Sequence, residues 1–74
     1  MLDTTAYVDE DERMKTKCKN GNTVENWYDR KTRSSVVQVL DAAGNQIGDA
    51  DYSGCRESAK YAKAQAIKAN GGKA

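Results

Sequence analysis

Acidic side chains near the start of the chain are the densest group that could carry out chemistry. Asp9, Glu10, Asp11 and Glu12 are consecutive, and metal-assisted hydrolases use carboxylates of this kind. Side chains at consecutive positions cannot all converge from one regular element, because neighbours in a strand point to opposite faces. The pattern gives little support to a metal site, and we expect neither a metal nor a cofactor.

Nucleophilic catalysis has as little support. The chain contains no histidine, which removes the commonest general base and the commonest zinc ligand. The serines therefore lack an activating partner. Cys18 and Cys55 do not form a C-x-x-C pair, and we expect two free thiols that pack as small hydrophobic residues. The sequence thus predicts a protein that is not an enzyme.

The 74 residues, with a net charge of +1, suffice for one small domain. No apolar run reaches the roughly 18 residues of a membrane span, and the first residues do not resemble a secretion signal. We therefore expect a cytoplasmic protein without a membrane partner. Acidic residues cluster before Arg13 and basic residues dominate after it. We read residues 1–12 as an acidic N-terminal arm, whether solvated, folded over a basic face or in contact with a partner, and residues 13–74 as one domain.

A β-hairpin is the clearest local prediction. Residues 13–19 alternate charged and less polar side chains, Asn20-Gly21 is typical of a two-residue turn, and residues 23–28 form a second strand. With a two-residue turn, Met14 lies opposite Trp27, Cys18 opposite Thr23, and Arg13 opposite Tyr28. Met14, Cys18 and Trp27 then share the core side of the sheet. The other side carries Arg13, Lys15, Lys17, Lys19, Val24, Asn26 and Tyr28.

The rest of the chain predicts two more strands and a helix. Residues 35–40 suit a central strand, residues 41–45 form a turn with Gly44 at positive φ, and residues 46–52 form a polar edge strand. Residues 55–69 are rich in alanine and helical, with Ser53 as the N-cap and residues 70–72 as the stop.

One narrow stripe of the helix would contact the sheet, flanked by Tyr61 and Ile67. The stripe consists of Cys55, Ala59, Ala62, Ala66 and Ala69. The fold class is α+β, an antiparallel β-meander of about four strands with one C-terminal α-helix packed on one face and the other face uncovered.

Basic residues and one tyrosine mark the uncovered face and an adjacent turn as the candidate partner-binding site. Such a face can contact phosphates and stack a base, or its long side chains can simply cover the sheet. The small net charge weighs against a dedicated nucleic-acid binder. The candidate residues are Arg13, Lys15, Lys17, Tyr28, Arg30, Lys31 and Arg33.

Residues 23–72 resemble the arm-type DNA-binding domains of phage integrases. The resemblance is carried by Trp27-Tyr28, the strand at 35–40, the Asp41-to-Gly44 turn and the helix with Glu57-Ser58-Ala59. It implies three strands plus a helix, with the sheet in the major groove. Asp49 and Asp51 depart from the basic residues that this family favours there. The overall type is also similar to the short accessory proteins of bacteriophages.

These observations predict a small non-catalytic protein that docks on a larger protein. A phage-type inhibitor or modulator of a host enzyme, such as RNA polymerase, a nuclease or a CRISPR complex, fits this description. The alternative is a DNA- or RNA-binding domain that uses the same basic face. We expect no small-molecule substrate in either case.

Overall fold

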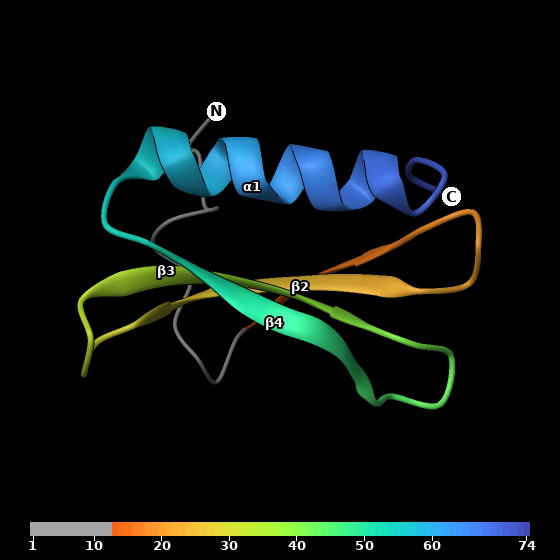
Figure 1. The fold of residues 1–74 in the computed structure, drawn as a ribbon, viewed down its shortest axis with the longest axis horizontal. Helices are drawn as coiled ribbons and strands as arrows, with labels where there is room; N and C mark the ends of the chain where they lie inside the picture. The colour runs from red at the N-terminus through yellow and green to blue at the C-terminus, as the bar shows by residue number, and fades with distance from the viewer. Residues whose placement is uncertain (1–12) are drawn as a thin grey trace.

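The computed structural model describes residues 13–74, which form a four-stranded antiparallel sheet and one helix packed on it (Figure 1). The strand order β1-β2-β3-β4 follows the chain, so the predicted meander and the α+β class are confirmed. The acidic arm at residues 1–12 lies outside the described residues. The elements are β1 (Met14–Lys17), β2 (Thr23–Asp29), β3 (Ser34–Leu40), β4 (Gln46–Ser53) and α1 (Arg56–Ala69).

The register of the first hairpin differs from the prediction by one residue. Met14 lies opposite Asn26, not Trp27, and Lys17 lies opposite Thr23 in place of Cys18. The backbone N–H of Cys18 donates to the carbonyl of Asn22 at 2.8 Å, so three residues form the loop. Gly21 has φ +92°, which suits the left-handed position of a three-residue loop. A slip of one residue turns every side chain of β2 to the other face relative to β1.

The core therefore lies on a different set of residues from the predicted one. Cys18, Val24 and Val37 are buried in one cluster, and Val39, Ala62, Ala66 and Ile67 pack against it. Val24 and Asn26, predicted to lie on the uncovered side, are both fully buried. Met14 lies in the same row as Asn26 but is 38% exposed at the edge strand. Trp27 alternates with these residues and belongs to the face opposite α1.

The N-cap of the helix lies two residues after the predicted one. Ser53 does not cap it, because the Ser53 hydroxyl donates to Asp51 at 2.8 Å, and Cys55 occupies the N-cap position. Within the predicted stripe Ala59 is buried, and Ala62 and Ala66 reach the core. Cys55 and Ala69 are exposed at its two ends. Tyr61 is 68% exposed, whereas its predicted counterpart Ile67 packs on the core.

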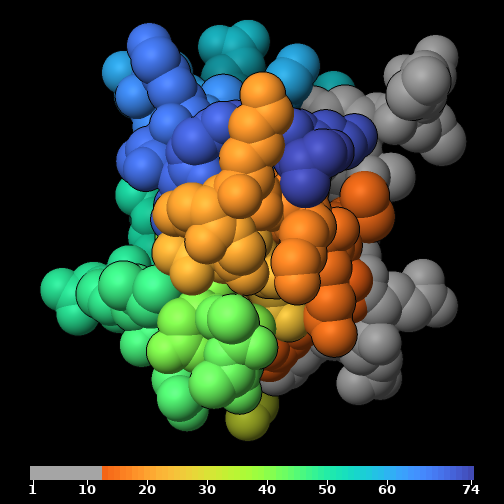
Figure 2. Space-filling view, turned by 90° about the vertical axis from the view of Figure 1, so that its right-hand side faces the viewer, coloured from red at the N-terminus to blue at the C-terminus, as the bar shows by residue number. Residues whose placement is uncertain are grey.

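The end of α1 is joined to the first hairpin. Gly71 and Gly72, at φ +89° and +91°, donate to the carbonyls of Lys68 and Ile67, the pattern of a Schellman motif. Asn70 Oδ1 accepts hydrogen bonds from the side-chain amides of Asn20 at 2.9 Å and Asn22 at 2.8 Å. In Figure 2 the hairpin turn, in orange, lies against the end of the helix, in blue.

The residues after the Schellman motif continue this contact along β1. Lys73 forms an isolated antiparallel bridge with Cys18. The backbone N–H of Ala74 donates to the carbonyl of Lys17 at 2.9 Å, and that of Lys19 donates to the carbonyl of Gly72 at the same distance. This hairpin-to-helix contact, absent from the sequence prediction, fixes the helix across the sheet at one end.

Candidate functional site: the open face of the sheet

The face of the sheet opposite α1, here called the open face, carries three rows of paired side chains. No helix or strand within residues 13–74 covers it. The first row runs across Trp27, Val36 and Tyr52, the second across Lys15, Glu25 and Gln38. The third consists of Lys17, Thr23, Leu40 and Gln46.

The first row is largely apolar and aromatic. Trp27 is 7% exposed and Val36 is 1% exposed, while Tyr52, on the edge strand β4, is 59% exposed. The guanidinium of Arg13 lies over the Trp27 ring, 3.8 Å from its centroid, a cation–π arrangement. The row therefore combines two buried side chains, Trp27 and Val36, with the large exposed side chain of Tyr52, which a partner can contact.

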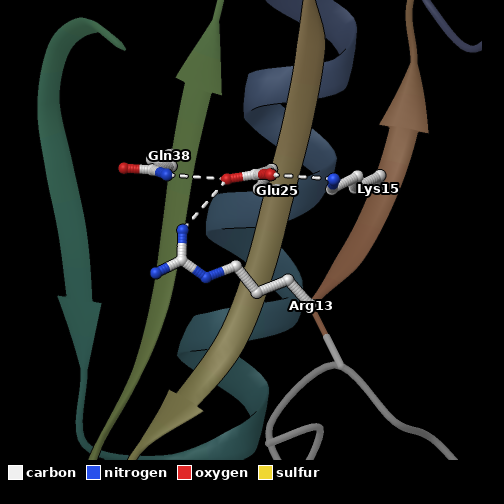
Figure 3. A network of polar contacts seen from close by, with 4 residues as sticks. All are labelled: Arg13, Lys15, Glu25 and Gln38. Atoms are coloured by element: carbon white, nitrogen blue, oxygen red, sulfur yellow. Dashed lines mark hydrogen bonds and ion pairs between the residues drawn. The ribbon is translucent and has the colours of Figure 1, made fainter. Parts of the chain in front are cut away.

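A buried carboxylate organises the second row (Figure 3). The Glu25 side chain is only 6% exposed, and its Oε1 accepts a hydrogen bond from Gln38 Nε2 at 2.7 Å. Arg13 Nη1 lies 3.4 Å from the same oxygen, and Lys15 Nζ lies 3.8 Å from Oε2. Arg13 also stacks on Trp27, so this side chain joins the first two rows. The carboxylate offsets part of the positive charge that the sequence places on this face.

The structure divides the predicted partner-binding residues into three locations. Arg13, Lys15 and Lys17 lie together on the open face, as predicted. Tyr28 lies on the other face, because it is two residues from Asn26 and four from Val24 along β2 and therefore points to the same side as they do. The predicted pairing of Arg13 with Tyr28 is therefore wrong, and Tyr52 is the exposed tyrosine of the open face.

The three basic residues of the turn between β2 and β3 are exposed at one end of the molecule. They are Arg30, Lys31 and Arg33. Asp29 holds this turn, since its carboxylate accepts hydrogen bonds from the Lys31 backbone N–H at 3.0 Å and from the Thr32 hydroxyl at 2.9 Å. Arg33 has φ +54°, an uncommon conformation for a residue with a side chain.

Tyr28 belongs to a separate hollow of about 370 Å³ beside the start of α1. Arg33, Cys55 and Arg56 contribute to its lining. Both cysteines are free thiols, as predicted, but only Cys18 is buried, and Cys55 is exposed. A hydrogen bond with the Ser58 hydroxyl, and another with the Ser58 backbone, lower the pKa of the Cys55 thiol. No pattern in the sequence indicates that Cys55 is exposed or that its pKa is lowered.

Sequence reasoning missed Glu25 and Tyr52 as parts of this face. Both follow from strand pairing: Glu25 pairs with Lys15, and Tyr52 pairs with Val36 beside Trp27. The predicted hairpin register hid the pair of Lys15 and Glu25, and it placed Tyr28 on the uncovered face in error. Opposite charges at a directly paired position were a usable signal, since Lys15 and Glu25 stabilise the observed register.

Comparison of the chain with protein-family models, with curated proteins and with solved structures finds no match. The resemblance to the integrase arm-type domains therefore stays a prediction. In the part of the chain that the structure describes, no helix has both the length and the apolar character needed to cross a membrane.

Proposed function

We propose that this protein is a non-catalytic binding module that docks on a larger protein through its open face. The observation that carries the proposal is the row of Trp27, Val36 and Tyr52, with Arg13 stacked on the tryptophan. Tryptophan, tyrosine and arginine are the residues that contribute most to protein interfaces. Here Tyr52 is the exposed member, supported by side chains that already pack against one another.

The surroundings of Tyr52 define the partner surface that fits. Lys15 and Lys17 lie on the same face, on the opposite edge strand β1, and the exposed turn with Arg30, Lys31 and Arg33 borders one end of the sheet. A complementary surface has a pocket for the tyrosine ring and, apart from it, carboxylates that meet the lysines of β1 and the basic turn. More specifically, we propose that the larger protein is a host enzyme and that this protein is its phage-type inhibitor or modulator.

The charge of the open face favours a protein over a nucleic acid. Nucleic-acid binding relies on lysine and arginine side chains that neutralise phosphates and thereby release the counterions condensed on the nucleic acid. Arg13 and Lys15 both approach the Glu25 carboxylate, so their charges are partly offset before any partner arrives. The buried Trp27 ring, under Arg13, offers no free surface on which a base could stack.

Affinity capture from bacterial lysate, with and without nuclease, tests the proposal. The wild-type protein is compared with Tyr52→Ala and with Tyr61→Ala, a matched change of an exposed tyrosine on α1. We expect one protein to be retained in stoichiometric amount after nuclease treatment. Its affinity for purified target should fall by about 2 kcal/mol in Tyr52→Ala, the loss typical of an interface hot spot. Tyr61→Ala should bind this target as the wild type does.

Two outcomes contradict the proposal. Loss of all captured material on nuclease treatment, with binding that weakens steeply as salt rises, would establish the nucleic-acid alternative. Equal affinity of the wild type and Tyr52→Ala for the captured protein would place the interface away from the open face.

A further inference from the structure

A groove lies on the other side of the sheet, between α1 and the strands β3 and β4, with a volume of about 630 Å³. Its floor is apolar and consists of Val37, Val39, Ala62 and Ala66. Small alanine side chains of α1 line the groove on one side, and the pairing of β3 with β4 is irregular between Val37 and Val39 on the other. The volume is within the range of about 300–1,000 Å³ of ligand pockets, so it holds a few side chains.

The charged residues around this groove are all acidic. Asp49 and Asp51 from β4 and Glu57 from α1 line it, and no lysine or arginine does. The uncharged polar residues of the lining are Ser53, Ser58, Tyr61, Gln65 and Gln38, of which Gln38 has its side chain bonded to Glu25 on the open face. The chain as a whole has a net charge of +1, so the groove is a local region of the opposite sign. Carboxylates gathered along a concave surface focus negative potential into it.

The strand that supplies two of these carboxylates is an edge strand. Within residues 13–74 no strand pairs with the outer side of β4. An extended peptide can therefore lie along β4 without displacing another strand, and its side chains alternate between the floor of the groove and the outside. Charged residues on an edge strand discourage its pairing with other strands, and two carboxylates repel an acidic segment most strongly. Asp49 and Asp51 therefore select against acidic segments and for basic ones.

We propose that this groove binds an extended segment of a partner protein in which lysine or arginine residues alternate with apolar ones. The apolar side chains point to the Val37 and Val39 floor, and the longer basic side chains point outward and bend to the exposed carboxylates of Asp49, Asp51 and Glu57. Tyr61, which is 68% exposed at the rim, covers the apolar stem of a bound lysine or stacks on an arginine. The proposal goes beyond docking through the open face and depends on different residues.

A blocked hexapeptide of alternating lysine and leucine is the probe, and the same peptide with glutamate in place of lysine is its control. Calorimetric titration measures binding to the full-length protein, and backbone NMR shifts locate it. We expect saturable binding of the lysine peptide with a dissociation constant of about 1 mM or tighter. The shifts should fall on β4 and on the groove side of α1. Binding should weaken by about tenfold between about 0.05 M and 0.5 M salt, because these carboxylates are exposed to screening.

Two pairs of substitutions distinguish binding in the groove from a general effect of net charge. Asp49→Asn with Asp51→Asn keeps the size of both side chains and should weaken lysine-peptide binding by about tenfold. Ala42→Lys with Ala64→Lys changes the net charge by the same amount at exposed positions outside the groove. This control should reduce affinity much less. Tyr61→Ala should weaken binding by about fivefold or more, whereas Tyr52→Ala should leave it unchanged.

The groove inference is overturned if the lysine peptide does not bind saturably, if the glutamate peptide binds equally well, or if the two charge variants weaken binding equally. Loss of peptide binding in Tyr52→Ala, with NMR shifts confined to the open face, would also overturn it and leave the open-face proposal intact. If the lysine peptide still binds in the groove, but the wild type and Tyr52→Ala bind the captured protein with equal affinity, only the open-face proposal is contradicted.

Discussion

A single carboxylate controls the electrostatics of the open face. Glu25 is buried among Arg13, Lys15 and Gln38, and each of these contacts one of its oxygens. An ionised carboxylate removed from water needs such partners, because an unpaired buried charge is strongly destabilising. Arg13 is held by two interactions, one with this carboxylate and one with the Trp27 ring. The guanidinium therefore serves the fold, and Lys17 and Tyr52 are better placed to meet a partner.

The two thiols should differ sharply in reactivity. The Ser58 hydroxyl and its backbone N–H stabilise the Cys55 thiolate, so the pKa of this exposed thiol is lowered and the thiolate forms at lower pH than in an ordinary cysteine. Cys18 is 2% exposed. We expect iodoacetamide to modify Cys55 in the folded protein and Cys18 only after denaturation, as mass spectrometry of peptides would show.

Ser58→Ala provides the matched test of the cause. Without the hydroxyl the pKa of Cys55 should rise, so the midpoint of the alkylation rate against pH should move upward. Identical pH profiles for the wild type and Ser58→Ala would show that this hydroxyl does not stabilise the thiolate.

At the scale of elements, the sequence specified the strands and the helix far better than their register. Local patterns suffice for the former: alternation in β1, β-branched residues in β3 and alanines in α1 each agree with the structure. The loop at residues 18–22 differs from the predicted one, because Asn20-Gly21 fits both a two-residue loop and the end of a three-residue loop. That one-residue difference exchanged Tyr28 for Tyr52 on the open face. The rest of the site depended on pairing between distant strands, which no local pattern records.

The connection between hairpin and helix depends on Asn70. Its side chain accepts two hydrogen bonds, from Asn20 and Asn22, and donates a third to the carbonyl of Ala66 at 2.7 Å. We expect Asn70→Ala to lower the free energy of unfolding by about 1–3 kcal/mol, since several partners lose a hydrogen bond at once. Urea denaturation followed by circular dichroism measures this change.

Asn45→Ala, in the exposed turn between β3 and β4, is the control and should cost less than about 0.5 kcal/mol. Faster hydrogen exchange at the Lys19 and Asn20 amides should accompany Asn70→Ala, because these amides donate to Gly72 and Asn70 across the connection. Equal stability of the two variants would mean that the backbone bonds alone join hairpin to helix.

At the scale of the whole molecule, stability is shared between two thin layers. One lies under α1 around Val24 and Val37, and the other is the Trp27 and Val36 pair on the open face. A domain of this length buries only about 60% of the surface of its unfolded chain. Because neither layer alone holds the domain together with a wide margin, a large substitution in either one should lower the free energy of unfolding of the whole domain.

Val24→Ala tests the layer under the helix. Val24 is 0% exposed, and removing two methyl groups leaves a cavity that costs about 2 kcal/mol. For a domain of this size the melting temperature should fall by about 10 °C, as thermal circular dichroism would show. Ile47→Ala, at a position that is 44% exposed, should change it by only a few degrees. Equal effects would contradict the placement of the core under α1.

The Arg13 side chain over Trp27 has an optical consequence. The chain contains one tryptophan, so all of its indole emission arises from this single ring with a cation 3.8 Å from its centroid. A partner that displaces the Arg13 guanidinium, or removes water molecules from around it, changes the electric field at the Trp27 ring. The wavelength of the tryptophan emission then shifts. A ligand in the groove beneath α1 meets the opposite side of the sheet. The molecule thus carries a built-in spectroscopic reporter that distinguishes its two surfaces without any label.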